Sequence, residues 1–267
     1  MAAAAQRLSR SRLPNHIIST RHGSARLRVA AVVAALLPIG AAGPQLPGLG
    51  RNESRVGIDS AAMPWAAVVR LQIPGVSRCT GFMLAPRIAI TAAHCLYGRR
   101  LGRFAPPGSV HVLSGYVDGA FTHHSIASSF RVAEGYDPLA TRGTQGADVA
   151  VVILAAAMSA AATGLPLDHD PVASGTPLML GGYGQDRAVR IAADVACTAL
   201  GYAAAPNGQA MLVHDCAGTR GTSGGPVLAR GPDGTWRVVG VQVASNPSNA
   251  GGLAVPAAAI RAILLER

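Results

Sequence analysis

The sequence predicts an all-β protein built in two halves. From Trp65 onward, short apolar or alternating runs follow one another, which is typical of strands. Gly, Pro, Asn and Asp separate these runs and indicate turns. Near the middle, the alanines of Ala155–Ser174 could support a helix, but its Gly and Pro favour a connection. Many short strands on both sides of such a connection favour a sandwich or barrel architecture.

Residues 1–42 are predicted to be an export signal or an N-terminal anchor. A long arginine-rich segment leads into the apolar run Val29–Ala42, which ends in small residues, as secretory signals do. The run is too short for a comfortable transmembrane helix. We therefore expect a secreted or periplasmic protein, without a stable membrane partner unless this segment is retained. The Pro-, Gly- and polar-rich residues 43–62 are predicted to be a linker.

The positive charge of the chain is concentrated at its beginning. All 23 basic side chains are arginine, and the net charge is +10. The first 42 residues hold six of these arginines and no Asp or Glu. The remaining charge is spread thinly and is not interleaved with aromatic residues, so nucleic-acid binding is not predicted. The six arginines are Arg7, Arg10, Arg12, Arg21, Arg26 and Arg28.

The 267 residues are enough for one large or two small domains. We assign the first β half to residues 63–160, a linker to 161–175 and the second half to 176–267. The runs predicted as strands are Ala66–Leu71, Gly81–Leu84, Ile88–Thr91, Ser109–Ser114, Val149–Leu154, Pro177–Leu180, Met211–Val213 and Val238–Val243.

The end of the chain, Val255–Arg267, predicts a short helix. Pro256 suits a first helical turn, where its missing N–H costs nothing. Ile260, Ile263 and Leu264 are spaced to form one apolar face.

Ser223 lies among three glycines in the stretch Gly221–Pro226, of sequence GTSGGP. Glycine permits a tight turn and a close approach to the main chain. An exposed hydroxyl beside free backbone N–H groups is what an acyl-transfer nucleophile and its oxyanion hole require. A plain Gly/Ser turn between strands explains the local pattern equally well. The rest of the chain has to decide between these interpretations.

A general base and an orienting acid would favour the nucleophile. His94 follows the apolar run Ile88–Thr91 and two alanines, which leave its ring accessible. Asp148 opens the run Asp148–Leu154, where an ionised carboxylate is costly unless it is paired. Each residue also has a structural interpretation, as a satisfied histidine after a strand and as a turn residue at a strand start. Whether the three residues meet in space is not visible in the sequence.

The four cysteines are expected to form disulfides, because an even number in an exported chain favours them. No two are spaced as C-x-x-C, so a zinc ribbon or a redox dithiol is not indicated. Four cysteines allow three pairings. The sequence-local pairing, Cys79–Cys95 with Cys197–Cys216, closes two loops that could each stabilise the fold by about 3 kcal/mol. Four buried free thiols are the alternative.

Three blocks, in this order, resemble the active-site blocks of trypsin/chymotrypsin-like serine peptidases. They are TAAHC at Thr91–Cys95, DVAVVIL at Asp148–Leu154 and GTSGGP at Gly221–Pro226. The resemblance extends from about Met63 to the end of the chain. It implies a chymotrypsin-like fold of two antiparallel β-barrels with a short C-terminal helix, and a disulfide between Cys79 and Cys95.

The resemblance also implies a role for each matching residue. His94 would be the general base, Asp148 its orienting acid and Ser223 the nucleophile of a secreted serine endopeptidase. The backbone N–H groups of Gly221 and Ser223 would form the oxyanion hole. A protein or peptide is the expected substrate, no cofactor is needed, and a monomer is expected.

The sequence departs from family members that are activated by cleavage. Those relatives carry an aspartate just before the serine, whereas this chain has Thr222. Arg55-Val56-Gly57 resembles an activation site only faintly. We therefore predict no cleavage-driven switch, and the pattern is closest to bacterial secreted, glutamyl-endopeptidase-like members.

The specificity pocket departs from the best-known patterns too. Trypsin-like members place an aspartate six residues before the serine, where this chain has Ala217, although Asp215 is close in sequence. Glutamate-specific relatives use a histidine at the position of about Gln242. A small or apolar residue before the cleaved bond is the expected preference. The predicted pocket residues are Ala217, Val243, Ala244 and Ser245.

Three other functions compete with this hypothesis. The stretch around Ser223 also fits the G-x-S-x-G elbow of α/β-hydrolases, but that fold needs a later histidine and the last one is His214. His111, His123 and His124 could bind a metal, but exposed loop histidines are the simpler explanation and no metal site is predicted. A catalytically silent binding module on a protease fold is the remaining alternative.

Overall fold

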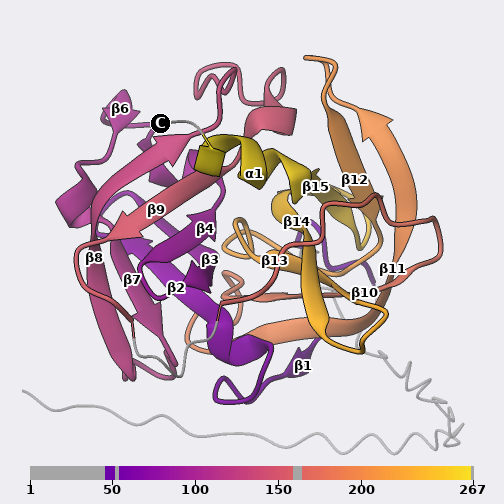
Figure 1. Cartoon of the computed structure of the whole chain (residues 1–267), viewed down its shortest axis with the longest axis horizontal. Coiled ribbons are helices and arrows are strands. Elements are labelled where there is room, and N and C mark those ends of the chain that lie inside the picture. Colours follow the sequence, from indigo (N-terminus) through magenta and orange to yellow (C-terminus); the bar gives the residue numbers. More distant parts are fainter. Residues whose placement is uncertain (1–45, 52–53, 159–163, 266–267) are drawn as a thin grey trace, which may run out of the picture. The chain divides into compact units, whose positions relative to one another are not determined.

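The computed structural model describes residues 46–51, 54–158 and 164–265. Within these residues the chain forms two antiparallel six-stranded β-barrels and one short α-helix (Figure 1). The all-β, two-barrel prediction is therefore confirmed. The predicted export signal or anchor at residues 1–42 lies outside the described residues, as do 159–160 at the end of the assigned first half and 161–163 of the assigned linker.

The first barrel closes in the strand order β2-β3-β4-β9-β8-β7. Short 3-10 turns and one small hairpin connect its strands. Its strands are β2 (Val68–Ile73), β3 (Ser77–Ala85), β4 (Ile88–Thr91), β7 (His111–Ser114), β8 (His123–Val132) and β9 (Ala150–Leu154). The connecting elements are η1 (Trp65–Ala67), η2 (Ala93–Leu96), β5 (Tyr97–Gly98), β6 (Arg103–Phe104), η3 (Pro107–Ser109) and η4 (Gln145–Ala147).

The second barrel closes in the order β10-β11-β12-β15-β14-β13, because β13 pairs back onto β10. The two-residue strand β1 (Val56–Gly57) adds to the free edge of β11. The barrel strands are β10 (Pro177–Gly182), β11 (Ala192–Ala204), β12 (Ala210–His214), β13 (Pro226–Arg230), β14 (Trp236–Ser245) and β15 (Gly252–Pro256).

The pairing of β4 with β9 brings the ends of two distant segments together. Both strands are short, apolar and largely buried, as the barrel interior requires. Their register is antiparallel, with Thr91 at the end of β4 opposite Ala150 at the start of β9. The residues that follow β4 and precede β9 must therefore lie at the same end of the barrel. These residues include His94 in η2 and Asp148.

The terminal helix begins later than predicted. Helix α1 spans Ala258–Leu265, whereas the prediction began at Val255. Val255 and Pro256 instead pair with β14 as the end of β15, so strand hydrogen bonds take precedence over a helical start. Ile260 and Ile263 are buried, but Leu264 is 37% exposed and lies off that face. The helix contacts β15 and also β9 of the first barrel.

Four of the barrel strands were not predicted. Strands β8 and β11 are largely polar or rich in small residues and expose many side chains, which obscures an apolar alternation. Strands β13 and β15 follow glycine-rich turns that hid their beginnings. The predicted linker 43–62 contains β1, which pairs with β11, so part of it belongs to the second barrel sheet. The exact domain boundaries stay predictions.

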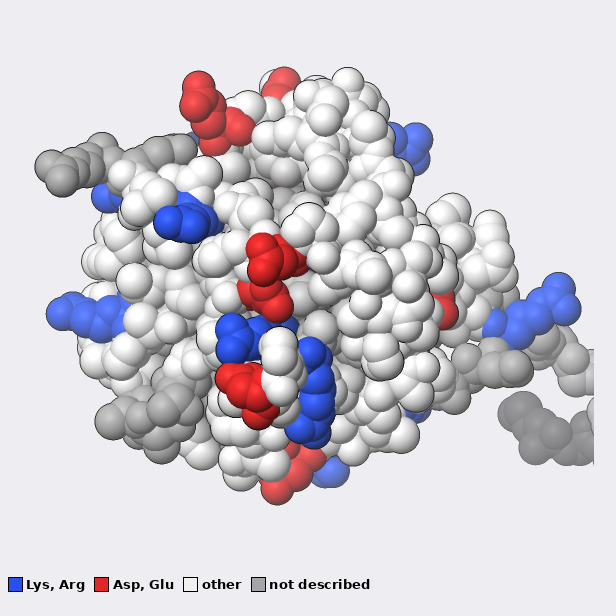
Figure 2. Space-filling view, turned by 45° about the vertical axis from the view of Figure 1, so that its right-hand side comes forward, with Lys and Arg blue, Asp and Glu red and all other residues white. Residues whose placement is uncertain are grey.

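Charged side chains of both signs are mixed on one face of the molecule. On the face shown in Figure 2, blue and red residues lie next to one another rather than in patches of one sign. The absence of nucleic-acid binding stays a prediction. Of the helices in the described residues, none has the length and apolar character needed to cross a bilayer.

Candidate active site

His94 and Asp148 are in direct contact. The Nδ1 atom of His94 lies 2.6 Å from Oδ2 of Asp148, and the backbone N–H of His94 donates to Oδ1 at 2.8 Å. Asp148 is only 3% exposed, so both of its oxygens have partners that compensate for its burial. The carboxylate orients the ring with Nδ1 as the protonated nitrogen. Nε2 is then left as a proton acceptor.

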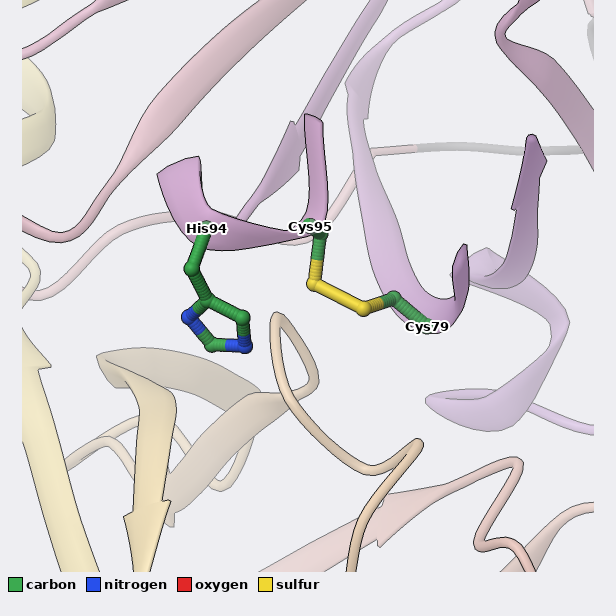
Figure 3. Close-up of side chains that lie close together, drawn as sticks. All are labelled: Cys79, His94 and Cys95. Carbon is green, nitrogen blue, oxygen red and sulfur yellow. A yellow bond between two sulfur atoms is a disulfide. The ribbon is translucent and has the colours of Figure 1, made fainter. Parts of the chain in front are cut away.

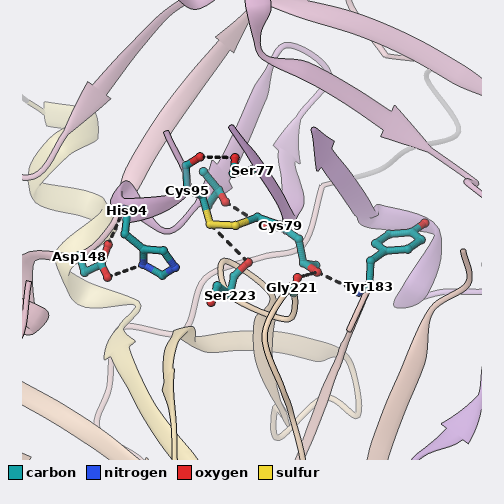
Figure 4. The surroundings of a disulfide bond; sticks show 10 residues. Ser77, Cys79, His94, Cys95, Asp148, Tyr183, Gly221 and Ser223 are labelled. Carbon is teal, nitrogen blue, oxygen red and sulfur yellow. Dashed lines mark hydrogen bonds and ion pairs between the residues drawn. A yellow bond between two sulfur atoms is a disulfide. The ribbon is translucent and has the colours of Figure 1, made fainter. Parts of the chain in front are cut away.

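Ser223 lies on the turn beneath this imidazole ring (Figure 4). The turn is tied to the first barrel by a hydrogen bond from the Thr80 N–H to the Ser223 carbonyl, at 2.9 Å. Although the structure describes both residues, no hydrogen bond joins Ser223 Oγ to His94. Such contacts are often loose without substrate and tighten in the complex. The three residues singled out from the sequence are thus brought to one place.

Two glycines allow the chain to turn at Ser223. Gly221 has φ +92° and Gly224 has φ +82°, values that other residues rarely adopt. A Cβ at Gly224 would overlap the Thr80 carbonyl oxygen, and a Cβ at Gly221 would overlap the Tyr183 carbonyl oxygen. Within the described residues, the N–H groups of Gly221 and Ser223 donate to no protein acceptor. Two unpaired donors next to the hydroxyl can receive a developing oxyanion.

Thr80 of β3 is a site residue that the sequence analysis missed. It is fully buried, and its hydroxyl donates to the Gly221 carbonyl at 2.7 Å. The same hydroxyl accepts from the Tyr183 N–H at 2.9 Å. One side chain of the first barrel therefore fixes two segments of the second. A threonine inside an apolar strand carries no local signal of this role.

Replacing Thr80 by valine is expected to lower kcat/KM for a peptide substrate by about tenfold, a loss of about 1.4 kcal/mol. Valine keeps the shape but leaves the Gly221 carbonyl and the Tyr183 N–H unpaired, at a cost of about 1–3 kcal/mol in folding stability. Steady-state kinetics and urea unfolding measure the two effects. Thr122→Val, an exposed threonine bonded to Ser114, is the control. Unchanged kinetics in Thr80→Val would contradict the role of Thr80.

The four cysteines form two disulfides, Cys79–Cys95 and Cys197–Cys216. Figure 3 shows the first beside His94, a cluster whose atoms lie close enough to resemble a metal site. Sulfur atoms joined in a disulfide cannot serve as thiolate ligands, so this cluster does not fit a metal. The disulfide instead anchors the short turn η2 that carries His94 to strand β3.

The predicted pocket residues lie on two segments near the serine turn. Ala217 is buried, and its N–H donates to Asp194 at 2.8 Å. Asp215 is exposed and accepts from the N–H and hydroxyl of Thr198, so its charge is already engaged elsewhere. On the facing segment, the Ser245 hydroxyl donates to the Gly218 carbonyl at 2.6 Å. This bond joins the serine loop to the end of β14.

Gln242 is paired with a histidine that the sequence analysis did not place near it. The Nε2 atom of His214, on β12, lies 2.7 Å from Gln242 Oε1, and both side chains are 1% exposed. Nδ1 of His214 is buried without a partner in the described structure. Burial lowers the pKa of His214, and the Gln242 hydrogen bond and the charges of Asp215 and Asp194 oppose this only in part.

The lowered pKa of His214 predicts a loss of stability in acid. Below a pH of about 6.5 the unfolded chain protonates this histidine while the folded protein does not, so stability falls as the pH falls. The slope from one such group reaches at most about 1.4 kcal/mol per pH unit. Urea unfolding at pH 7.5 and 5 should show a smaller loss for His214→Gln than for the wild type. The exposed His169, replaced by glutamine, is the control, and equal losses in both variants would contradict the prediction.

His111 and His124 lie on strands β7 and β8, which corrects their interpretation as loop residues. The diagonal position of the two residues across the strand pair brings His111 Nδ1 to 2.9 Å from His124 Nε2. Burial and the neighbouring His111 lower the pKa of His124. The pair lies outside the His94–Ser223 site.

Arg55 occupies the region of the supposed activation site. Its side chain is buried and forms an ion pair with Asp186, at 2.6 Å. Burial alone would raise the pKa of Asp186, but the hydrogen bonds and charge of Arg55 outweigh it and lower the pKa. Val56 and Gly57 continue as β1 against β11. Thr222 is buried within the serine turn and its N–H donates to the Thr219 carbonyl.

Comparison with known proteins shows a matching family and a shared fold. The family model for trypsin matches residues 55–264. Human transmembrane protease serine 5 is 31% identical over 205 residues, which cover 67% of this chain and 42% of that protein. The chain thus spans less than half the length of this relative. A solved structure of Glu endopeptidase in complex with MPD shares the fold, with a TM-score of 0.65 and 20% identity over 80% of this chain and 96% of that one.

Proposed function

The chain belongs to the trypsin family of serine peptidases, and from this premise we propose that it is a serine endopeptidase acting through His94, Asp148 and Ser223. The observation that carries the proposal is the contact of His94 Nδ1 with Asp148 above a serine turn in which, among the described residues, the N–H groups of Gly221 and Ser223 have no acceptor. A base, its orienting acid, a nucleophile and an anion site are then all present.

The proposed reaction uses only these groups. Ser223 Oγ attacks the peptide carbonyl while His94 Nε2 takes its proton, and the charge of the buried Asp148 stabilises the imidazolium. The N–H groups of Gly221 and Ser223 bind the oxyanion of the tetrahedral intermediate. The imidazolium then gives its proton to the leaving amine as the C–N bond breaks. Water, deprotonated by His94, hydrolyses the acyl-enzyme and restores the serine.

We assign substrate binding to the segments flanking the serine turn. A groove of about 580 Å³ is lined by Gln145, just before Asp148, and by Ala244 and Ser245 of β14, among others. His94, Asp148 and Ser223 do not line this groove, and we propose that a bound peptide extends from it to the serine turn. The hydrogen bond from the Ser245 hydroxyl to the Gly218 carbonyl holds the end of β14 close to the serine loop, which narrows the space between them. It supports a preference for a small or apolar residue before the cleaved bond.

We further propose that activity does not require a new N-terminus at Val56. Thr222 offers no carboxylate to a freed amine, and Arg55 already has an ion pair with Asp186. Secretion and a monomeric state are proposed as well. The two disulfides support an oxidising compartment.

The test is covalent labelling of the full-length protein by a fluorophosphonate, together with cleavage of a peptide library. One adduct is expected, on the tryptic peptide that carries Ser223, and labelling should abolish cleavage. A folded protein that neither labels nor cleaves would favour the silent binding module. An adduct confined to another serine would contradict the assignment of Ser223.

A further inference from the structure

We propose that the segment Leu46–Gly50 is a positioning element that holds together the two walls of the substrate pocket. The inference rests on the proposed function, since it gives this segment a role in the same site. The segment, here called the strap, precedes the family-matched residues 55–264. One wall is the serine loop Ala217–Ser223. The other is the end of β14 with the following Asn246.

Gly48 of the strap makes a hydrogen bond to each wall. Its N–H donates to the Asn246 carbonyl at 2.7 Å, and its carbonyl accepts from the Gly218 N–H at 2.9 Å. A β-bridge between Gly48 and Ala250 extends the contact of the strap with the chain that follows Asn246. With the bond from Ser245 to Gly218, the strap completes a continuous hydrogen-bonded link between the walls.

The contact requires glycine at position 48. Gly48 is buried and has φ +83°, a conformation that costs other residues about 1–2 kcal/mol. An added Cβ would overlap the Gly218 carbonyl oxygen and lie 2.8 Å from the Ser245 Cβ. Main-chain atoms cannot move aside without moving the wall itself. Any larger residue at position 48 would therefore push the serine loop and β14 apart.

The walls depend on such hydrogen bonds because no disulfide joins them. The two disulfides use all four cysteines, and neither joins the serine loop to β14. Cys197–Cys216 anchors the serine loop to β11, two residues before Gly218. Gly218 in turn lies three residues before Gly221, whose N–H we assign to the oxyanion hole. A shift of Gly218 should therefore alter the width of the pocket first and the oxyanion hole second.

The contacts of the strap favour support of the site over blockage. Its hydrogen bonds reach Gly218 and Asn246. In the part of the chain that the structure describes, none reaches His94 or Ser223. A segment that blocked the site would be expected to contact the nucleophile.

The test compares Gly48→Ala with Gly75→Ala in the full chain. Gly75 lies in the turn between β2 and β3 with φ +71°, and an added Cβ there meets nothing within 4 Å. Both variants carry the cost of alanine at positive φ, but only Gly48→Ala strains the pocket. It should lower kcat/KM for the best peptide by about tenfold, chiefly through KM. Labelling by a fluorophosphonate too small to need the pocket should slow much less, whereas Gly75→Ala should match the wild type in both assays.

Three results would overturn the role of the strap. The first is a rise in kcat/KM for Gly48→Ala, which would mean that the strap blocks the site. The second is that Gly48→Ala has the same kinetics as Gly75→Ala. The third is that Gly48→Ala loses labelling and peptide cleavage to the same extent. If Gly48→Ala does not fold, Gly50→Ala replaces it, because its Cβ would lie 3.0 Å from the Ala250 N atom, a smaller intrusion. An inactive, unlabelled wild type would contradict the proposed function itself. An active wild type with an unaffected strap variant would contradict the strap alone.

Discussion

Replacing Ser223 by alanine is expected to lower kcat by about 10⁶-fold, because the nucleophile and the acyl-enzyme are lost together. The fold should persist. Among the described residues Ser223 Oγ has no hydrogen-bond partner, while the bond from the Thr80 N–H uses the Ser223 carbonyl, which alanine keeps. A residual rate above that of uncatalysed hydrolysis is expected, since the oxyanion donors remain. Active-site titration and kcat at saturating peptide measure the change.

The control for this variant is Ser109→Ala. Ser109 is a half-buried serine whose hydroxyl donates to the Pro106 carbonyl at 2.7 Å. Its loss should leave kcat within about twofold of the wild type, in keeping with the small effect of most surface substitutions. If Ser223→Ala kept more than about a tenth of the wild-type kcat, Ser223 would not be the nucleophile.

Replacing Asp148 by asparagine should lower kcat by about 10⁴-fold with little change in shape. The amide can still accept from the backbone N–H of His94, which now bonds to Oδ1. Its NH₂ group, however, would face Nδ1 and donate to it. The imidazole would then carry its proton on Nε2, where it cannot accept the proton of Ser223. Pre-steady-state kinetics should show slow acylation.

Asp118→Asn is the matched control, because Asp118 also pairs with a basic side chain, Arg190. Asp118 is exposed and lies in the turn between β7 and β8, with Arg190 rather than a histidine as its partner. Exposed pairs contribute about 0–1 kcal/mol to stability, so this variant should retain wild-type kcat. Thermal unfolding of both variants separates lost chemistry from lost folding. A folded Asp148→Asn protein with wild-type kcat would show that His94 needs no orienting acid.

The predicted secondary structure matches the observed one where the conformation of a residue is set mainly by its neighbours in the chain. β4 was predicted with its exact bounds, since Ile88–Thr91 is a short apolar run between turn residues. Strand β8 was missed, because it exposes many polar side chains and draws its hydrogen bonds from β7 and β9. The terminal helix was placed too early, because the pairing of Val255 with Val241 is a contact with a distant strand.

The sequence by itself determined the fold class and the candidate nucleophile, base and acid. A serine among glycines, a histidine after an apolar strand and an aspartate before one are local patterns, and their order along the chain selects the fold. Only the tertiary structure decided which other side chains and main-chain groups form hydrogen bonds in and around the site. Thr80, the His214–Gln242 pair and Gly48 act through partners more than 25 residues away. Such partners are set by barrel closure and strand register, which no short stretch of sequence encodes.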